Sequence, residues 1–149
     1  MVRTLPDWYQ GLRIALPTPS FLQIDYNAVG YVKVPANSSV TFVFGAGFSE
    51  DLEWIPSPYR FVFTGASFSA DDNVRIMVEI LEESKDNPGS YKLRFRKKSF
   101  GEIDIVTGNV GIFVYNTRPV YRITNFSSKD ITVDFNVYGI LEDIESYKK

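Results

Sequence analysis

Cysteine and histidine are both missing from this 149-residue sequence. Without cysteine the chain has no disulfide bond, no thiolate metal site and no cysteine nucleophile. Without histidine it has no Ser-His catalytic pair, none of the common zinc sites and no side chain that titrates near neutral pH as an ordinary general base. Neither common type of Gly-rich phosphate loop is present. Catalysis would therefore depend on carboxylates, Lys, Tyr or an oxygen-ligated metal, and we expect no cofactor.

Long apolar runs are also missing, so the sequence predicts no membrane span. The first residues lack the apolar core of a signal peptide, and we expect a soluble chain without a cleaved leader. Charge is balanced, with 16 Lys and Arg against 18 Asp and Glu. A molecule with this balance is not a general electrostatic binder of nucleic acid, which we therefore do not expect as a partner.

Aromatic residues are abundant, with twelve Phe and nine Tyr. These residues suit the half-buried surfaces of strands. About ten short segments show strand-like alternation at fairly regular spacing, which predicts an all-β protein, an antiparallel β-sandwich of jelly-roll-like type. One domain of this length can bury an adequate core without covalent staples. We divide the chain into an N-terminal arm (1–20), a β-sandwich domain (21–141) and a C-terminal tail (142–149).

The clearest strand lies at residues 131–138. Alternation places four apolar residues on one face, and on the other face it places four residues that carry polar groups. The apolar residues are Ile131, Val133, Phe135 and Val137. A β-rich run at 121–126 precedes it, separated by the polar turn 127–130. The simplest connection between the two runs is an antiparallel hairpin.

The remaining strands are short and separated by turn-forming residues. We expect strands at 21–26, 29–34, 40–44, 59–64, 74–80, 91–96, 103–105 and 110–115, a loop at 65–73 and a polar turn at 82–90. Proline, glycine, asparagine and serine mark the connections.

The arm at residues 1–20 contains apolar and aromatic side chains but is interrupted by prolines. Trp8, Tyr9, Leu12 and Ile14 are candidate contact residues. In one interpretation the arm packs along its own sandwich. In the other it binds a neighbouring subunit, for which Trp and Tyr make good anchors.

Two acidic loops are candidates for chemistry. Glu50, Asp51 and Glu53 beside Trp54, with Tyr59 nearby, could form a sugar site, because glycoside cleavage uses two carboxylates. The simpler interpretation is a solvated loop whose tryptophan packs back on the sandwich. The segment 71–73, Asp-Asp-Asn, offers oxygen ligands to calcium, but the same residues are typical of a turn.

The strand at 91–98 carries the one concentrated group of cations. Its members are Lys92, Arg94, Arg96, Lys97 and Lys98. Tyr91, Leu93 and Phe95 alternate with them, so we expect these three residues in the core and the cations on the outside. Outward charges protect an edge strand or contact a subunit, and a salt-dependent contact with a polyanion is the alternative.

The segment 123–139, ITNFSSKDITVDFNVYG, resembles the closing hairpin of small β-sandwich virion proteins, such as the capsid-decoration, auxiliary and turret-type proteins of phages and archaeal viruses. The segment 34–42, VPANSSVTF, is similar in character. The resemblance implies a structural role, a symmetric oligomer such as a trimer, and no catalytic residues.

The resemblance, together with the lack of a catalytic set of residues, implies a non-enzymatic, capsid-associated structural protein of a virus particle as the first hypothesis. Its expected partners are copies of itself, with a trimer favoured, and other capsid proteins; its expected location is the virion. A carbohydrate-binding β-sandwich that uses Trp54 and Tyr59 is the alternative. An enzyme built on the carboxylates of the two acidic loops is a third hypothesis, and the absence of histidine weighs against it.

Overall fold

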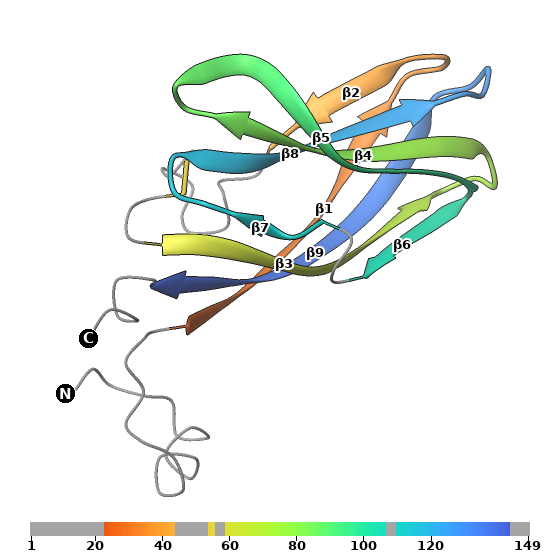
Figure 1. Cartoon of the computed structure of the whole chain (residues 1–149). Coiled ribbons are helices and arrows are strands. Elements are labelled where there is room, and N and C mark those ends of the chain that lie inside the picture. Colours follow the sequence, from red (N-terminus) through yellow and green to blue (C-terminus); the bar gives the residue numbers. More distant parts are fainter. Residues whose placement is uncertain (1–22, 44–53, 56–58, 107–109, 144–149) are drawn as a thin grey trace, which may run out of the picture.

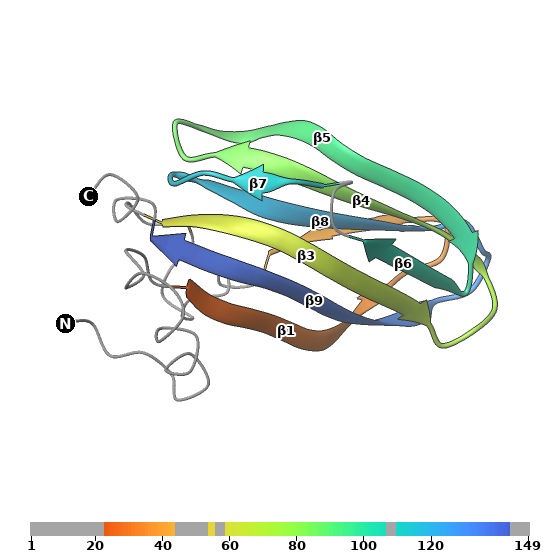
Figure 2. The same ribbon diagram turned by 60° about the horizontal axis from the view of Figure 1, so that its bottom comes forward.

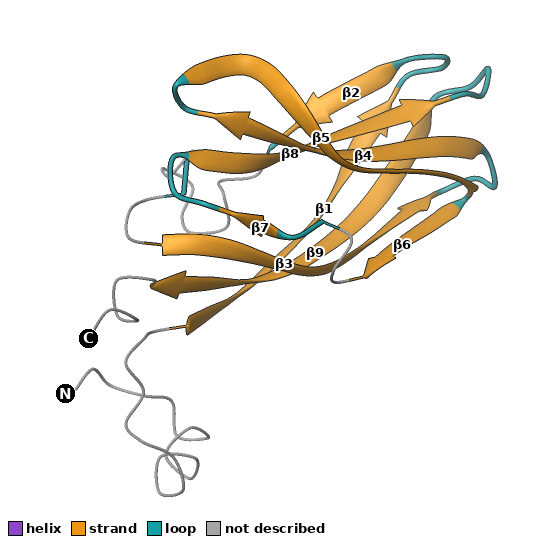
Figure 3. Cartoon of the chain, viewed as in Figure 1, coloured by secondary structure: helices purple, strands orange, loops and turns teal. Residues whose placement is uncertain are grey.

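The computed structural model describes residues 23–43, 54–55, 59–106 and 110–143. In these ranges the chain forms strands and turns and contains no helix (Figure 3). The strands are β1 (Gln23–Val34), β2 (Ser39–Phe42), β3 (Tyr59–Ala70), β4 (Arg75–Ser84), β5 (Asn87–Phe100), β6 (Glu102–Val106), β7 (Ile112–Phe113), β8 (Thr117–Asn125) and β9 (Ile131–Asp143).

The strands form two antiparallel sheets that face each other (Figures 1 and 2). Sheet A has the order β1-β9-β3-β6, with the two-residue β7 also paired to β3, and sheet B has the order β2-β8-β4-β5. Most connections cross from one sheet to the other, and only β4 and β5 are consecutive strands that pair as a hairpin. A five-stranded and a four-stranded sheet in this order form a jelly roll, which confirms the predicted fold class.

The predicted hairpin of residues 121–126 and 131–138 is wrong. Both segments are strands, but β8 lies in sheet B between β2 and β4, whereas β9 lies in sheet A between β1 and β3. The turn between them therefore passes from one sheet to the other. Its residues fit either geometry, because a polar turn between two apolar runs specifies a reversal of direction but not the strand that each run pairs with.

Several predicted boundaries also differ from the structure. The two strands expected at 21–26 and 29–34 are one continuous strand, β1, and the loop expected at 65–73 is mostly strand, because β3 extends to Ala70. The turn expected at 82–90 is reduced to Lys85 and Asp86. Long pairing partners explain these extensions, since β9 pairs with β1 and β3 along nearly their whole lengths, and β4 pairs with β5 and β8 as far as Ser84. Ladder bonds outweigh the local preference of Gly, Ser and Asn for turns.

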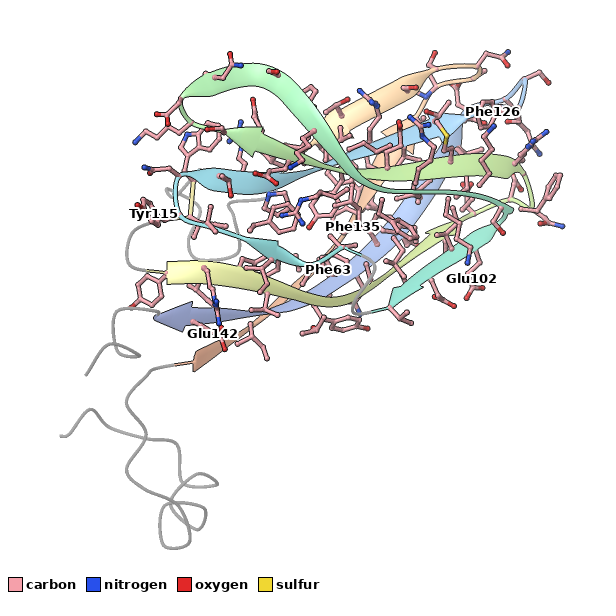
Figure 4. All side chains as sticks on the ribbon, in the orientation of Figure 1. Phe63, Glu102, Tyr115, Phe126, Phe135 and Glu142 are labelled. Carbon is pink, nitrogen blue, oxygen red and sulfur yellow. The ribbon has the colours of Figure 1, made fainter. Side chains whose placement is uncertain are left out.

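The core lies between the sheets and agrees with the predicted alternation. The apolar face of 131–137 is inward, and Ile76, Val78 and Ile80 of β4 are fully buried opposite it. Aromatic rings fill the centre: Phe135 of sheet A contacts Phe42 of sheet B at 5.3 Å between ring centroids. Figure 4 shows Phe135 and Phe63 between the two sheets. Burial of large rings on both inner faces holds the sandwich together.

Gly139 on β9 shows how closely the inner side chains approach the backbone. A Cβ atom at this position would lie only 2.1 Å from Cε1 of Phe61 on the adjacent strand β3. The Phe61 ring therefore lies directly against the β9 backbone, where only glycine leaves it enough space.

Candidate functional site

The outer face of sheet B carries a buried carboxylate held by two arginines. Glu79 of β4 is only 2% exposed although it points away from the core. Arg122 Nε donates to Glu79 Oε1 at 2.8 Å, and Arg96 donates to Glu79 Oε2 through Nε at 2.9 Å and Nη2 at 2.7 Å. Burial alone would raise the pKa of Glu79, but the hydrogen bonds and charges of Arg122 and Arg96 outweigh it and hold the pKa below its ordinary value.

A further ion pair lies on the same face between Arg118 and Glu83, which are cross-strand partners four residues along each strand from Arg122 and Glu79. Arg118 Nε of β8 donates to Glu83 Oε1 at 2.8 Å, and the other oxygen of Glu83 accepts the backbone N–H of Gly89 at 2.7 Å. The Arg118 guanidinium also stacks over the Trp54 ring, with 4.0 Å from Cζ to the ring centroid. One arginine therefore joins the edge segment 54–55 to the sheet.

The two aromatic residues proposed for carbohydrate binding lie in different places. Trp54 is half-buried under Arg118 beside sheet B, whereas Tyr59 begins β3 of sheet A and packs against the core. The structure does not bring them to one face. Glu50, Asp51 and Glu53 lie outside the described residues, so the carbohydrate hypothesis stays a prediction.

Arg94 differs most from expectation among the five cations of β5. The β4–β5 pairing is shifted by one residue between Ile80 and Leu81, so Arg94 occupies a β-bulge. Its Nε donates to Glu82 Oε1 at 2.9 Å, and its other nitrogens donate to the carbonyl oxygens of Val110 and Ile112. Arg94 therefore connects the edge of sheet B to the β7 region of sheet A, and the prediction that it points outward is wrong.

The same bulge reverses the predicted faces of Tyr91 and Leu93. Both residues are exposed, and Leu93 pairs with Leu81 on the outer face of sheet B. Phe95, beyond the bulge, packs against the core as predicted. An extra residue in one strand exchanges inward and outward positions on one side of it, and periodicity alone does not reveal where that residue lies.

The other four cations of the group remain at the surface of the edge strand β5. Lys92, Lys97 and Lys98 are exposed, and Arg96 is half-exposed while it binds Glu79. Lys98 and Arg96 lie on the outer face of sheet B, because their partners Met77 and Glu79 alternate with the buried Ile76, Val78 and Ile80.

Exposed aromatic rings share this outer face, which the sequence analysis did not anticipate. Phe100 pairs directly with Arg75, and the backbone N–H of Phe126 donates to the carbonyl of Arg75 at 3.1 Å from the other side of β4. Arg75 and Lys98 both lie over the Phe126 ring, at 5.7 Å and 5.6 Å from its centroid. Extending the alternation of Arg96 and Lys98 by two residues would have placed Phe100 on the charged face.

The two outer faces of the sandwich carry opposite charge. On sheet B the described residues comprise five cations (Arg75, Arg96, Lys98, Arg118 and Arg122) and two carboxylates (Glu79 and Glu83). On sheet A the residues whose side chains are described comprise two cations (Lys33 and Arg60) and four carboxylates (Glu102, Asp104, Asp134 and Glu142). The small net charge of −2 therefore conceals a polarised molecule.

The outer edge of β1 is the second unusual surface among the described residues. β1 is the outermost strand of sheet A, and among the described strands it pairs with β9 alone. The segment between Asp25 and Lys33 contains no charged residue and no proline. Val29 is 71% exposed and Tyr31 65% exposed on its outer side. An edge of this kind is a template for pairing with another chain.

The Asp-Asp-Asn segment 71–73 forms the turn between β3 and β4. Asp71 Oδ1 accepts the backbone N–H of Thr132 at 3.1 Å, and Asp72 pairs with Lys129 at 3.1 Å. Within the described ranges no group of three or more acidic side chains is placed to hold a metal ion.

The predicted arm residues Trp8, Tyr9, Leu12 and Ile14 lie outside the described residues, and so does most of the tail at 142–149. In the part of the chain that the structure describes, no helix is long and apolar enough to cross a membrane.

No protein-family model matches the chain, and no curated protein sequence matches it. Similar solved structures include a mitogen from Yersinia pseudotuberculosis, with 9% identity over 76% of this chain and 86% of that chain and a TM-score of 0.49. A protein from the triple jelly-roll turret of an archaeal virus is 11% identical over 83% of this chain and 30% of that chain, with a TM-score of 0.48. The decameric BFDV capsid protein is 8% identical over 82% of this chain and 98% of that chain, with a TM-score of 0.42.

These neighbours include viral capsid and turret proteins, but all three TM-scores are below 0.5. Similarity at this level carries no argument about activity or partners, because one jelly-roll architecture serves many functions. We therefore infer the function from the surfaces of this chain.

Proposed function

We propose that this protein is a non-enzymatic structural component of a virus particle, a capsid-associated jelly roll of the decoration, auxiliary or turret type that works as a symmetric oligomer. The viral assignment is supported by a fold that is common among viral capsid domains. The resemblance of segment 123–139 to virion proteins supports it at the level of sequence only, because the two strands of this segment lie in different sheets and form no hairpin. The absence of cysteine and histidine supports a non-enzymatic role. The proposed location is the virion, and the proposed partners are copies of the chain and other capsid proteins.

Self-association is inferred from the contrast between β1 and the other sheet edges. β2 has only four residues, β6 has outward Glu102 and Asp104, and β5 combines cations with a bulge. These features are known devices against edge-to-edge pairing. β1 is twelve residues long and has none of them between Asp25 and Lys33. We infer that this edge is paired in the assembled protein.

The occupant that we propose is the N-terminal arm of a neighbouring copy. Residues 1–22 precede β1, and a segment of this length can extend about 70 Å, which is enough to reach a neighbour. Within it, Leu12 and Ile14 alternate with Arg13 in the pattern of a strand, and Trp8 and Tyr9 supply anchors. Donation of a strand from each copy to the next is a head-to-tail contact, and such contacts close into rings when the rotation permits. A trimer is the ring that we expect.

The test is the mass of the protein in solution, measured by light scattering coupled to size exclusion. The full chain is expected to be a trimer, and a chain lacking residues 1–20 is expected to be a folded monomer. Val29→Lys with Tyr31→Lys places two charges on the proposed acceptor edge and is expected to give a monomer as well. The control is Val106→Lys, a similarly exposed position on β6 at the opposite edge of the same sheet.

Two results would contradict the proposal. A shortened chain that assembles like the full chain would exclude the arm, and a monomeric full chain at every concentration would exclude self-association. Circular dichroism and thermal unfolding of each variant distinguish a loss of assembly from a loss of fold.

A further inference from the structure

A row of aromatic and basic side chains crosses the outer face of sheet B near one end of the sandwich. Phe100 of β5, Arg75 of β4 and Phe126 after β8 lie side by side, and Lys98 approaches the Phe126 ring from the next row. We name these four residues the aromatic–basic row. Figure 4 shows Phe126 at the end of the sandwich opposite Tyr115.

Large rings in this row are open to solvent. Phe100 is 64% exposed and Phe126 is 43% exposed. Both would be expected in the core of an isolated sandwich, because exposing a phenylalanine forfeits about 2 kcal/mol of burial. Arginine and lysine beside the rings keep the surface soluble and also give it positive charge.

The charge of this face is only partly neutralised from within. Glu79 is shared between Arg96 and Arg122, and Glu83 is occupied by Arg118. The two carboxylates therefore leave a surplus of three positive charges, and no acidic residue of β4, β5 or β8 faces the row apart from these two. A surface of this composition is complementary to a chain of phosphates.

We propose that the aromatic–basic row binds single-stranded nucleic acid. Arg75, Lys98 and the half-exposed Arg96 contact phosphates, and a base stacks on Phe100. A flat sheet with exposed rings and flanking cations suits unpaired bases, whose faces are open for stacking, whereas a duplex hides its bases in the stack. Nucleic acid was not expected as a partner, because the overall charge is balanced and the apolar and aromatic residues that alternate with the cations of β5 were expected in the core. The surplus of cations on the outer face of sheet B removes the first objection, and the outward Tyr91 and Phe100 remove the second.

This inference does not depend on the proposed oligomer, since β1 and the aromatic–basic row lie on different sheets. The experiment measures fluorescence anisotropy of labelled oligothymidylate of about 20 nucleotides with the full-length protein at several salt concentrations. Three phosphate contacts predict a slope of log affinity against log salt of about −2. Lys98→Ala is expected to reduce the slope by about 0.7, and Phe100→Ala to weaken binding about tenfold with little change in slope.

Matched controls come from other surfaces of the molecule. Lys33→Ala removes an exposed cation from the outer face of sheet A, and Tyr115→Ala removes an exposed ring from the opposite end. Both are expected to bind the oligonucleotide as the parent does. Thermal unfolding and light scattering of every variant separate a change in binding from a change in fold or oligomer.

Three outcomes would overturn the inference. The first is no binding at low salt. The second is heparin competing at equal charge concentration while Phe100→Ala binds normally, which would assign the surface to a polyanion without bases. The third is a smaller oligomer for Lys98→Ala or Phe100→Ala, which would assign the row to a contact between copies of the chain.

Discussion

At the scale of single residues, alternation predicted the inward apolar side chains but not the buried charge at Glu79. Its position between Val78 and Ile80 predicts an outward and solvated glutamate. The side chain does point outward, but it is not solvated. It is buried because Arg96 and Arg122 approach it from the two neighbouring strands, one from each side. Such a group is visible only when the register of three strands is known.

The ion pairs of Glu79 predict a specific dependence of stability on pH. Because its folded-state pKa lies below the ordinary value of 4.5, the unfolded chain binds more protons near that pH, and stability rises with pH there. The contribution of Glu79 is complete above about pH 4.5 and is lost as the pH falls through the folded-state value. Glu79→Gln does not titrate, so the stability difference between parent and variant should shrink between about pH 7 and about pH 3.

Urea unfolding of both proteins across this pH range makes the comparison. Glu102→Gln, which removes an exposed carboxylate from the outer face of sheet A, is the control and should change stability by less than about 0.5 kcal/mol. A difference between parent and Glu79→Gln that is the same at both ends of the range would show that the charge of Glu79 contributes nothing.

At the scale of elements, the sequence predicted strands more accurately than connections. The segments 121–126 and 131–138 are strands, yet they lie in different sheets. The residue that hydrogen bonds across this crossing is Asn125. Its side chain is fully buried and donates to the carbonyls of Val34, Pro35 and Lys129, at 3.2, 3.2 and 2.8 Å. Its Oδ1 accepts from the N–H and the hydroxyl of Ser127, at 2.8 and 2.7 Å. No local pattern reveals these bonds, because two acceptors lie about ninety residues away along the chain.

Asn125→Ala is therefore expected to lower the free energy of unfolding by about 3 kcal/mol, because it leaves buried carbonyls and an N–H without a partner. Denaturant unfolding measures this loss. Asn136→Ala is the matched control, since Asn136 lies on the outer face of sheet A and donates one described hydrogen bond, to the Tyr138 hydroxyl. Its cost should stay within about 1 kcal/mol. Equal costs for the two variants would mean that the bonds of Asn125 do not stabilise the crossing.

At the scale of the whole molecule, composition and spacing predicted a jelly-roll-like sandwich, but the polarity of its faces needed the strand order. Once β4, β5 and β8 are known to be neighbours, cations distant in sequence gather on one face and carboxylates on the other. The same order leaves β1 at an edge. Assembly is thus a property of the topology, and a mixing experiment can test its direction.

A chain lacking residues 1–20 retains the acceptor edge, and the chain with Val29→Lys and Tyr31→Lys retains the donor arm. Each alone is expected to be monomeric, and an equimolar mixture should form a complex of one chain of each kind. That complex cannot close into a ring, because the shortened chain has no arm to donate and the substituted chain accepts none. If β1 instead pairs with β1 of a second copy, the shortened chain should dimerise by itself and the mixture should form no such complex. Light scattering distinguishes the two results, because only strand donation from the arm predicts a mixed pair from two monomers.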